Sequence, residues 1–167
     1  MTAARMKKAA RISLAGMALL ALAACAPGRD RYGDPREGYL LDPWQWEVLA
    51  DWSAVKTIGV VLTEFKFLPD GLVFEQGVPY RLRLENMGDY THFFAAEGFF
   101  KSIAVRSLVS SEETVSHPLL EEIAVPSGAV RELTFVPVRV GVYELDCTVL
   151  GHAFFGMTGT IEIVGES

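Results

Sequence analysis

Hydrophobic and polar residues alternate along much of this chain with the two-residue period of β-strands. The clearest run is Tyr-Arg-Leu-Arg-Leu at residues 80–84, and the other runs are rich in Val, Ile, Thr and Phe. Turn-forming residues separate the runs, as in Pro69-Asp70-Gly71 and at Gly128 and Gly141. The pattern predicts an all-β chain folded as an antiparallel sandwich, with strands at residues 56–67, 72–74, 80–84, 130–136, 142–147 and 158–164.

Two segments depart from the strand period. Residues 42–54 begin with Asp42 and Pro43, a favourable helix start, and Gln45 stands where a capping box places it. Trp44, Val48 and Trp52 recur every four residues, so we expect a short helix that packs through this stripe. Residues 95–125 show no clear period and predict only an excursion, or insertion, between two strands.

Residues 1–24 have the composition of an export signal. Four basic residues and no acidic ones precede an apolar run at residues 12–22. This run is too short for a stable membrane span. The run ends in Leu22-Ala23-Ala24-Cys25, which resembles a bacterial lipobox. That resemblance implies lipidation of Cys25, which becomes the first mature residue. Ordinary cleavage at the A-x-A-like site Ala24-Cys25-Ala26 is the alternative.

Removal of this signal changes the charge. The precursor carries 15 basic and 21 acidic residues; without the four cations of residues 1–24 the net charge becomes −10. A basic surface for nucleic acid is therefore not expected. Residues 25–41 are rich in Gly, Pro and charge, so they predict a flexible tether between lipid and domain. We expect one domain, at residues 55–165, preceded by the tether and the helix.

Three potential soft-metal ligands lie close together near the C-terminus. Cys147, His152 and Met157 have C-x4-H-x4-M spacing and fall between the last two predicted strands. One loop at the end of the sandwich therefore carries a thiolate, an imidazole and a thioether. This set, with a second histidine, suits a blue-copper centre. Taken singly, Cys147 is equally consistent with a buried inert thiol and Met157 with core filler.

The second histidine is expected upstream. His92 follows the strand at residues 80–86 in the pattern Asn86-x-Gly88-x3-His92, with Phe93 next. With this pattern the chain resembles a small bacterial cupredoxin over residues 55–164. The resemblance implies a Greek-key β-sandwich, with His92, Cys147 and His152 as equatorial ligands of one type 1 copper ion and Met157 as the axial ligand.

Two positions near the ligands bear on this resemblance. Many cupredoxins have Asn directly after the first histidine, whereas this chain has Phe93; Thr148 after Cys147 is as in azurin-like loops. Four aromatic residues flank the ligands and are expected to exclude water from the metal: Phe93, Phe94, Phe154 and Phe155. His117 lies outside both ligand segments, and we expect it to play no part in the site.

The resemblance implies a one-electron carrier in the bacterial periplasm, held to a membrane by lipidated Cys25. His152 is the expected electron doorway to a redox partner protein such as a cytochrome. The alternative is copper trafficking or tolerance with the same site, passing the metal to a copper acceptor. We expect no enzyme activity, because copper reductases of this fold need a second copper built from several more histidines, and only His117 is spare.

Overall fold

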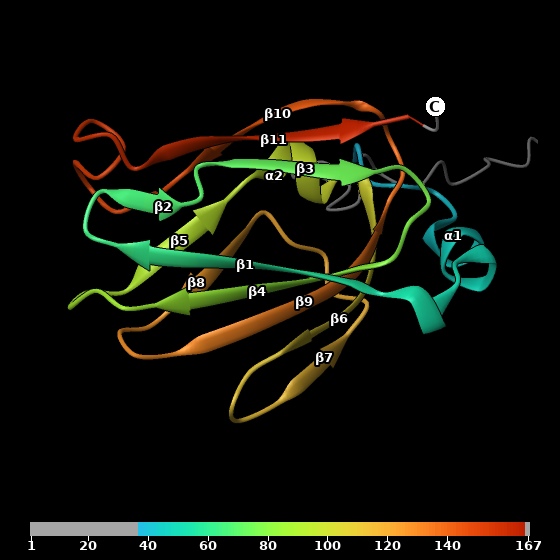
Figure 1. Cartoon of the computed structure of the whole chain (residues 1–167), viewed down its shortest axis with the longest axis horizontal. Coiled ribbons are helices and arrows are strands. Elements are labelled where there is room, and N and C mark those ends of the chain that lie inside the picture. Colours follow the sequence, from blue (N-terminus) through green and yellow to red (C-terminus); the bar gives the residue numbers. More distant parts are fainter. Residues whose placement is uncertain (1–36, 166–167) are drawn as a thin grey trace, which may run out of the picture. The chain divides into compact units, whose positions relative to one another are not determined.

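Alternating strands of the predicted kind build two packed sheets, shown in Figure 1. The computed structural model describes residues 37–165; the predicted signal, Cys25 and the tether up to residue 36 lie outside this range. The six-stranded sheet has the order β2-β1-β4-β9-β6-β7 and the five-stranded sheet the order β3-β11-β10-β5-β8. The first comprises β1 (Lys56–Thr63), β2 (Lys66–Leu68), β4 (Tyr80–Asn86), β6 (Ile103–Val109), β7 (Thr114–Ser116) and β9 (Val130–Pro137). The second comprises β3 (Gly71–Glu75), β5 (His92–Ala95), β8 (Glu122–Val125), β10 (Gly141–Asp146) and β11 (Thr158–Val164).

The all-β sandwich is confirmed, but the strand predicted at residues 56–67 is wrong: a turn at residues 64 and 65 divides it into β1 and β2, which pair antiparallel. The sheets are also not purely antiparallel. Strand β1 runs parallel to β4, and β3 runs parallel to β11. The reason is a crossover after β2, where the chain leaves the first sheet and continues as β3 in the second. It returns to the first sheet as β4, in the direction of β1. Crossovers of this kind are part of Greek-key sandwiches.

The segment at residues 95–125 contributes to both sheets. It contains the short helix α2 (Glu97–Phe100) and the strands β6, β7 and β8. Strand β6 pairs with β9, and β8 pairs with β5. The excursion expected from the sequence is therefore in part a component of the sandwich itself.

Inward-facing side chains of the two sheets form the main core. In β4 every second residue is buried, and the same alternation recurs in β3 and β8. Phe74, Phe99 and Phe135 are fully buried, with ring centroids 5.2–5.6 Å apart; Phe74 stacks on Phe99, and both meet Phe135 edge to face. This aromatic centre fixes the two sheets against each other.

The predicted helix is shorter than expected and packs through a different face. Helix α1 (Pro43–Leu49) has Pro43 at its first position, but the Asp42 side chain makes no capping hydrogen bond. Trp44 and Val48 are exposed, at 60% and 74%, so the predicted stripe is wrong. Trp46 instead packs on a second apolar cluster on the outer side of β6 and β9, beside Trp52 of a separate 3-10 turn (Trp52–Ala54). Because α1 ends at Leu49, the four-residue repeat is broken before it reaches Trp52.

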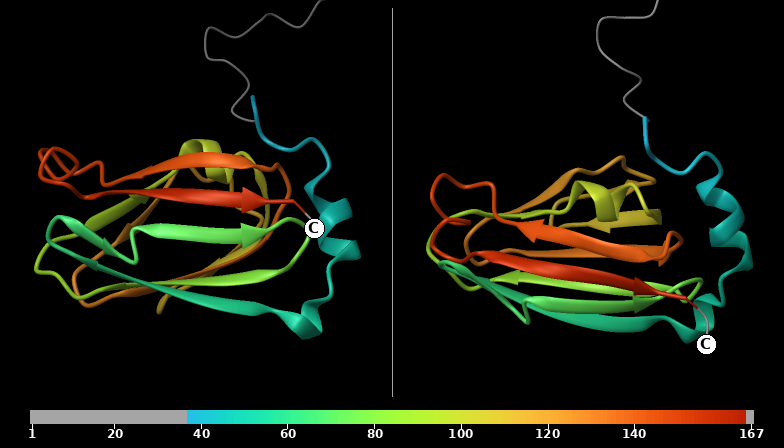
Figure 2. Two further views of the ribbon diagram at one scale, coloured as in Figure 1. Left: turned by 45° about the horizontal axis from the view of Figure 1, so that its top comes forward. Right: turned by 90° about the horizontal axis from the view of Figure 1, so that it is seen from above.

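Three loops meet at one end of the sandwich. The β1–β2 turn, the β4–β5 loop and the β10–β11 loop lie together there, and α1 lies at the opposite end (Figure 2). The two sequence segments that carry the predicted ligands are thus brought to the same edge.

Candidate metal centre

His92 is the first residue of β5, and a fully buried asparagine fixes the loop that leads to it. The Asn86 amide donates 2.7 Å hydrogen bonds to the carbonyls of Tyr90 and Val125, and its oxygen accepts one from the Gly88 N–H at 2.9 Å. All its polar groups are thereby satisfied. Asn86 therefore joins the end of β4, the β4–β5 loop and β8, and it sets where β5 begins.

Cys147, His152 and Met157 are held by backbone hydrogen bonds across the β10–β11 loop. The Cys147 N–H donates to the Met157 carbonyl at 3.1 Å, and the Met157 N–H donates to the His152 carbonyl at 2.9 Å. Gly151 and Gly156 have positive φ angles of 85° and 102°, the region that glycine enters at little cost. These contacts fold the loop back on itself, so residues 147, 152 and 157 converge.

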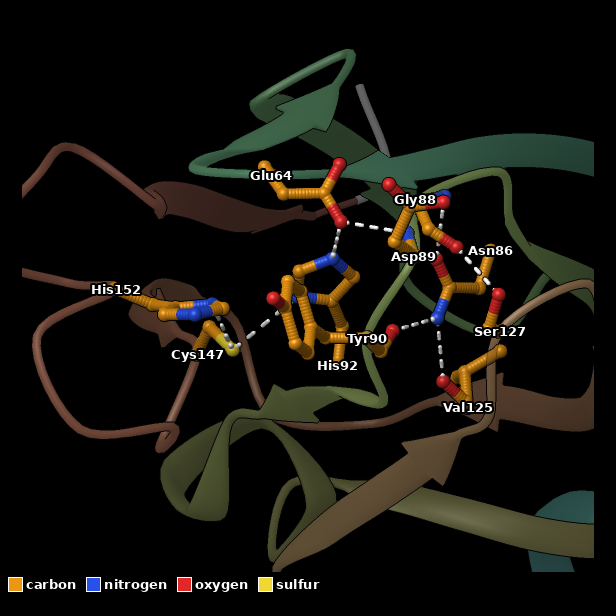
Figure 3. A network of polar contacts seen from close by, with 10 residues as sticks. All are labelled: Glu64, Asn86, Gly88, Asp89, Tyr90, His92, Val125, Ser127, Cys147 and His152. Carbon is orange, nitrogen blue, oxygen red and sulfur yellow. Dashed lines mark hydrogen bonds and ion pairs between the residues drawn. The ribbon is translucent and has the colours of Figure 1, made fainter.

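Three of the four predicted ligands form one cluster, shown in Figure 3. The Cys147 sulfur lies 3.9 Å from Nδ1 of His92 and 3.7 Å from Nδ1 of His152. One donor atom from each residue lies within 4.8 Å of the other two. In residues 37–165 this is the only such grouping of His, Cys, Asp and Glu.

These distances fit a metal ion at the centre. With metal–nitrogen and metal–sulfur distances of roughly 2.0 and 2.3 Å, ligands in a trigonal plane lie about 3.5–4.0 Å apart. The two measured separations fall in that range. A thiolate with two imidazoles in a trigonal arrangement is the donor set of blue-copper sites. The residues present therefore suit a copper ion.

Burial keeps His92 in the form that binds metal. Desolvation lowers the pKa of His92 below its usual value, and the charge of His152, when protonated, lowers this pKa further. The Glu64 carboxylate opposes this in part by raising the pKa of His92. The net lowering favours the neutral imidazole, which is the form that binds metal.

The structure was compared with solved structures. Similar folds include multicopper oxidases from Pseudomonas thermotolerans and Pediococcus acidilactici and a copper nitrite reductase from Nitrosomonas europaea. The first is 17% identical, with a TM-score of 0.55 over 69% of this chain and 31% of that one. The second is 15% identical, with a TM-score of 0.54 over 71% and 28%. The third is 12% identical, with a TM-score of 0.50 over 65% and 49%.

This chain has the cupredoxin fold. It spans less than a third of either oxidase. No protein-family model and no curated protein matches the sequence, so the likeness is one of fold. The β-sandwich and the position of the His-Cys-His cluster at one end of it agree with the family resemblance of the sequence.

Met157 is the fourth predicted ligand and lies on the same loop as Cys147 and His152. Its side chain is fully buried, and its backbone bonds to both Cys147 and His152. The role of its sulfur as the fourth, axial ligand stays a prediction.

The aromatic residues near the His-Cys-His cluster have different surroundings. Phe94 is fully buried and Phe93 half-buried, whereas Phe154 is 87% exposed and Phe155 is largely exposed. Phe65, which the sequence analysis missed, packs edge-on against His152 with ring centroids 5.2 Å apart. The Phe65 ring also packs on Phe155 with ring centroids 5.2 Å apart. His152, against which Phe65 packs, is 9% exposed.

Glu64 was also missed from the sequence. It precedes Phe65 in the β1–β2 turn, and its Oε1 lies 3.7 Å from Nε2 of His92. A single Glu-Phe pair inside a predicted strand carries no recognisable signal for a metal site. Only the approach of the β1–β2 turn to the other two loops gives these residues their place.

His117 lies apart from the cluster, as expected. It is exposed, and its Nε2 lies 3.2 Å from Oε2 of Glu47 in helix α1. No helix within residues 37–165 is long and apolar enough to cross a membrane.

Proposed function

We propose that this protein is a mononuclear type 1 copper protein that carries single electrons in the bacterial cell envelope. The observation behind the proposal is the buried His92–Cys147–His152 cluster, with Met157 beside it on the same loop. A copper ion held there supplies one-electron chemistry by alternating between Cu(II) and Cu(I).

The surroundings of the cluster support electron transfer. The ligands are anchored by backbone hydrogen bonds on both sides of the β10–β11 loop and by the Asn86 network below His92. Side chains fixed in this way keep nearly the same geometry in both oxidation states. Burial of all four predicted ligands also excludes water. Both features suit a site through which electrons pass repeatedly.

His152 is the proposed electron doorway. It is the most exposed of the four predicted ligands, and exposed apolar residues follow it and precede it on the loop. Leu150 and Phe154 are 99% and 87% exposed, and Phe155 packs on the Phe65 ring. Exposed apolar groups gathered at one place mark interaction sites. A redox partner would dock there weakly and transiently, as redox encounters do.

We propose a carrier rather than an oxidase or reductase, because a second copper needs further histidines. The only other histidine of the chain is His117. It pairs with Glu47 of α1, the helix at the opposite end of the sandwich from the three loops. Anchoring in the periplasm through lipidated Cys25 is part of the proposal and rests on the sequence alone. Loss of membrane association in a Cys25→Ser variant, measured by cell fractionation, tests that part.

The experiment that tests the carrier function compares electron exchange with metal release. The copper-loaded protein is mixed in a stopped-flow instrument with a reduced basic cytochrome, and separately with a copper chelator of high affinity. We expect rapid oxidation of the cytochrome while copper stays bound for much longer. Rapid loss of copper together with slow electron exchange would instead support the trafficking alternative.

A further inference from the structure

The far nitrogen of His92 has an unusual environment. Nε2 points away from Cys147, is buried, and has no hydrogen-bond partner among the described residues. The group that faces it is the Glu64 carboxylate, with Oε1 at 3.7 Å (Figure 3). Histidines that bind metal commonly have a carboxylate or carbonyl on the other ring nitrogen, which fixes the tautomer and the ring orientation.

Backbone contacts hold the Glu64 carboxylate in this position. Its Oε1 accepts a 2.6 Å hydrogen bond from the Asp89 N–H. A Cβ atom at Gly88 would collide with the carboxylate, so Gly88 leaves the space that Glu64 occupies. A hydrogen bond from a backbone N–H favours the ionised form of a carboxylate. The negatively charged Glu64 carboxylate is therefore held in a fixed position beside the loop that precedes His92.

We propose that Glu64 is a positioning residue of the metal site: it selects the His92 tautomer with its proton on Nε2 and, through its charge, favours the oxidised metal. The inference rests on the proposed copper function, since the second effect needs a redox-active ion. Through Glu64, the β1–β2 turn would contribute to a metal site whose predicted ligands all lie in or next to other loops.

Two separate physical effects follow. With the proton on Nε2, the lone pair of Nδ1 faces the Cys147 sulfur and is free to bind metal. The negative charge stabilises Cu(II) more than Cu(I), because the oxidised ion carries the greater positive charge. For a fixed unit charge close to the imidazole we expect an effect of roughly tenfold on the ratio of oxidised to reduced protein.

Two substitutions separate these effects. Glu64→Gln removes the charge but keeps an oxygen that can accept a hydrogen bond from the Nε2–H group of His92, whereas Glu64→Ala removes both. Asp89→Asn is the matched control, because it removes one charge from the same loop and keeps the backbone N–H that binds Glu64. The tautomer is measured on the metal-free protein by nitrogen-detected NMR of the His92 ring, and the reduction potential on the copper-loaded protein.

We expect wild type, Glu64→Gln and Asp89→Asn to carry the proton on Nε2, and Glu64→Ala to show a mixture of tautomers. Both Glu64 variants should raise the reduction potential by about 59 mV, the equivalent of tenfold for one electron, and Asp89→Asn should raise it far less.

A wild-type proton on Nδ1, or equal potentials in Glu64→Gln and Asp89→Asn, would overturn the proposal. If wild type forms no copper–thiolate site, the proposed function fails, while the tautomer of the metal-free protein still tests the role of Glu64. Should Glu64→Ala not fold, Glu64→Gln decides.

Discussion

At the scale of single residues, the two predicted histidine ligands depend on one turn that carries no ligand itself. Glu64 faces the far nitrogen of His92, and the next residue, Phe65, packs against His152. Phe65 has a φ of 64°, a left-handed conformation that costs a non-glycine residue about 1 kcal/mol or more. The contacts of its ring with His152 and Phe155 offset that cost.

Asn86 is the residue whose loss should most disturb the loop before His92. We predict that Asn86→Ala lowers the free energy of unfolding of the metal-free protein by about 2–4 kcal/mol, because three buried hydrogen bonds are lost and their partners are left unsatisfied. Urea unfolding measures this loss. Ser127→Ala is the control, since Ser127 makes one hydrogen bond to the same loop, at the Gly88 carbonyl. An equal or smaller loss in Asn86→Ala would contradict the structural role of Asn86.

Met157 can be tested without disturbing the core. Met157→Leu nearly conserves volume, so we predict a change of less than about 1.5 kcal/mol in the free energy of unfolding of the metal-free protein. If the thioether is the axial ligand, its loss removes a donor from Cu(II) and raises the reduction potential. Voltammetry and the visible spectrum measure this effect. An unchanged potential and spectrum would show that Met157 only fills the core.

The candidate ligands were predictable because three of them share one loop. Cys147, His152 and Met157 are residue types with metal chemistry at regular spacing. The asparagine and glycine before His92 indicated that this histidine is the fourth candidate ligand. Glu64 and Phe65 were not predictable, since their roles arise only when the β1–β2 turn meets two distant loops. Asn86 stood in the pattern that pointed to His92, but its buried hydrogen bonds required the structure.

At the scale of elements, strands with a clean alternation were predictable and irregular ones were not. Strand β6 reads Ile-Ala-Val-Arg-Ser-Leu-Val, and its register with β9 shifts between Val105 and Ser107. Such a bulge breaks the two-residue period within the strand. Strand β7 is exposed along its whole length, and β8 has only four residues. Residues 95–125 therefore gave little pattern to interpret.

Helix α1 offers a matched pair of tryptophans for testing its packing. We predict that Trp46→Ala lowers the free energy of unfolding by about 1–3 kcal/mol, because Trp46 covers the apolar cluster of Ala104, Val136 and Val138. Trp44→Ala should change it by no more than about 0.5 kcal/mol, since this side chain is mostly exposed. Thermal or urea unfolding of the two variants measures the difference. The reverse order would mean that α1 packs through the stripe predicted from the sequence.

At the scale of the whole molecule, the candidate metal site and helix α1 occupy opposite ends of the sandwich (Figure 2). The helix lies at the N-terminal side of the domain, where the chain continues toward the proposed lipid anchor. The His-Cys-His cluster and the β10–β11 loop, which carries the exposed residues Leu150 and Phe154, belong to the other end. A partner that docks beside His152 would therefore not compete with α1 for the same surface.

The net charge of the mature chain predicts how partner binding responds to salt. With an excess of 10 acidic residues after removal of residues 1–24, association with a basic cytochrome should be steered electrostatically. We predict that the second-order rate constant falls as ionic strength rises from about 10 mM to about 150 mM. Stopped-flow absorbance measures it for the reduced cytochrome and the Cu(II) protein, with a neutral small-molecule reductant in place of the cytochrome as the control. A rate constant for the cytochrome that is unchanged or rises with salt would contradict steering.

The central claim is that His92, Cys147 and His152 together bind a single copper ion, and titration of the metal-free protein with Cu(II) tests it most directly. The visible spectrum and the electron paramagnetic resonance signal are recorded at each addition, for wild type and for Cys147→Ser. We predict an intense thiolate-to-copper charge-transfer band that saturates at one equivalent in wild type and is absent from Cys147→Ser. A band that never appears in wild type, or one that persists without the Cys147 sulfur, would contradict the account.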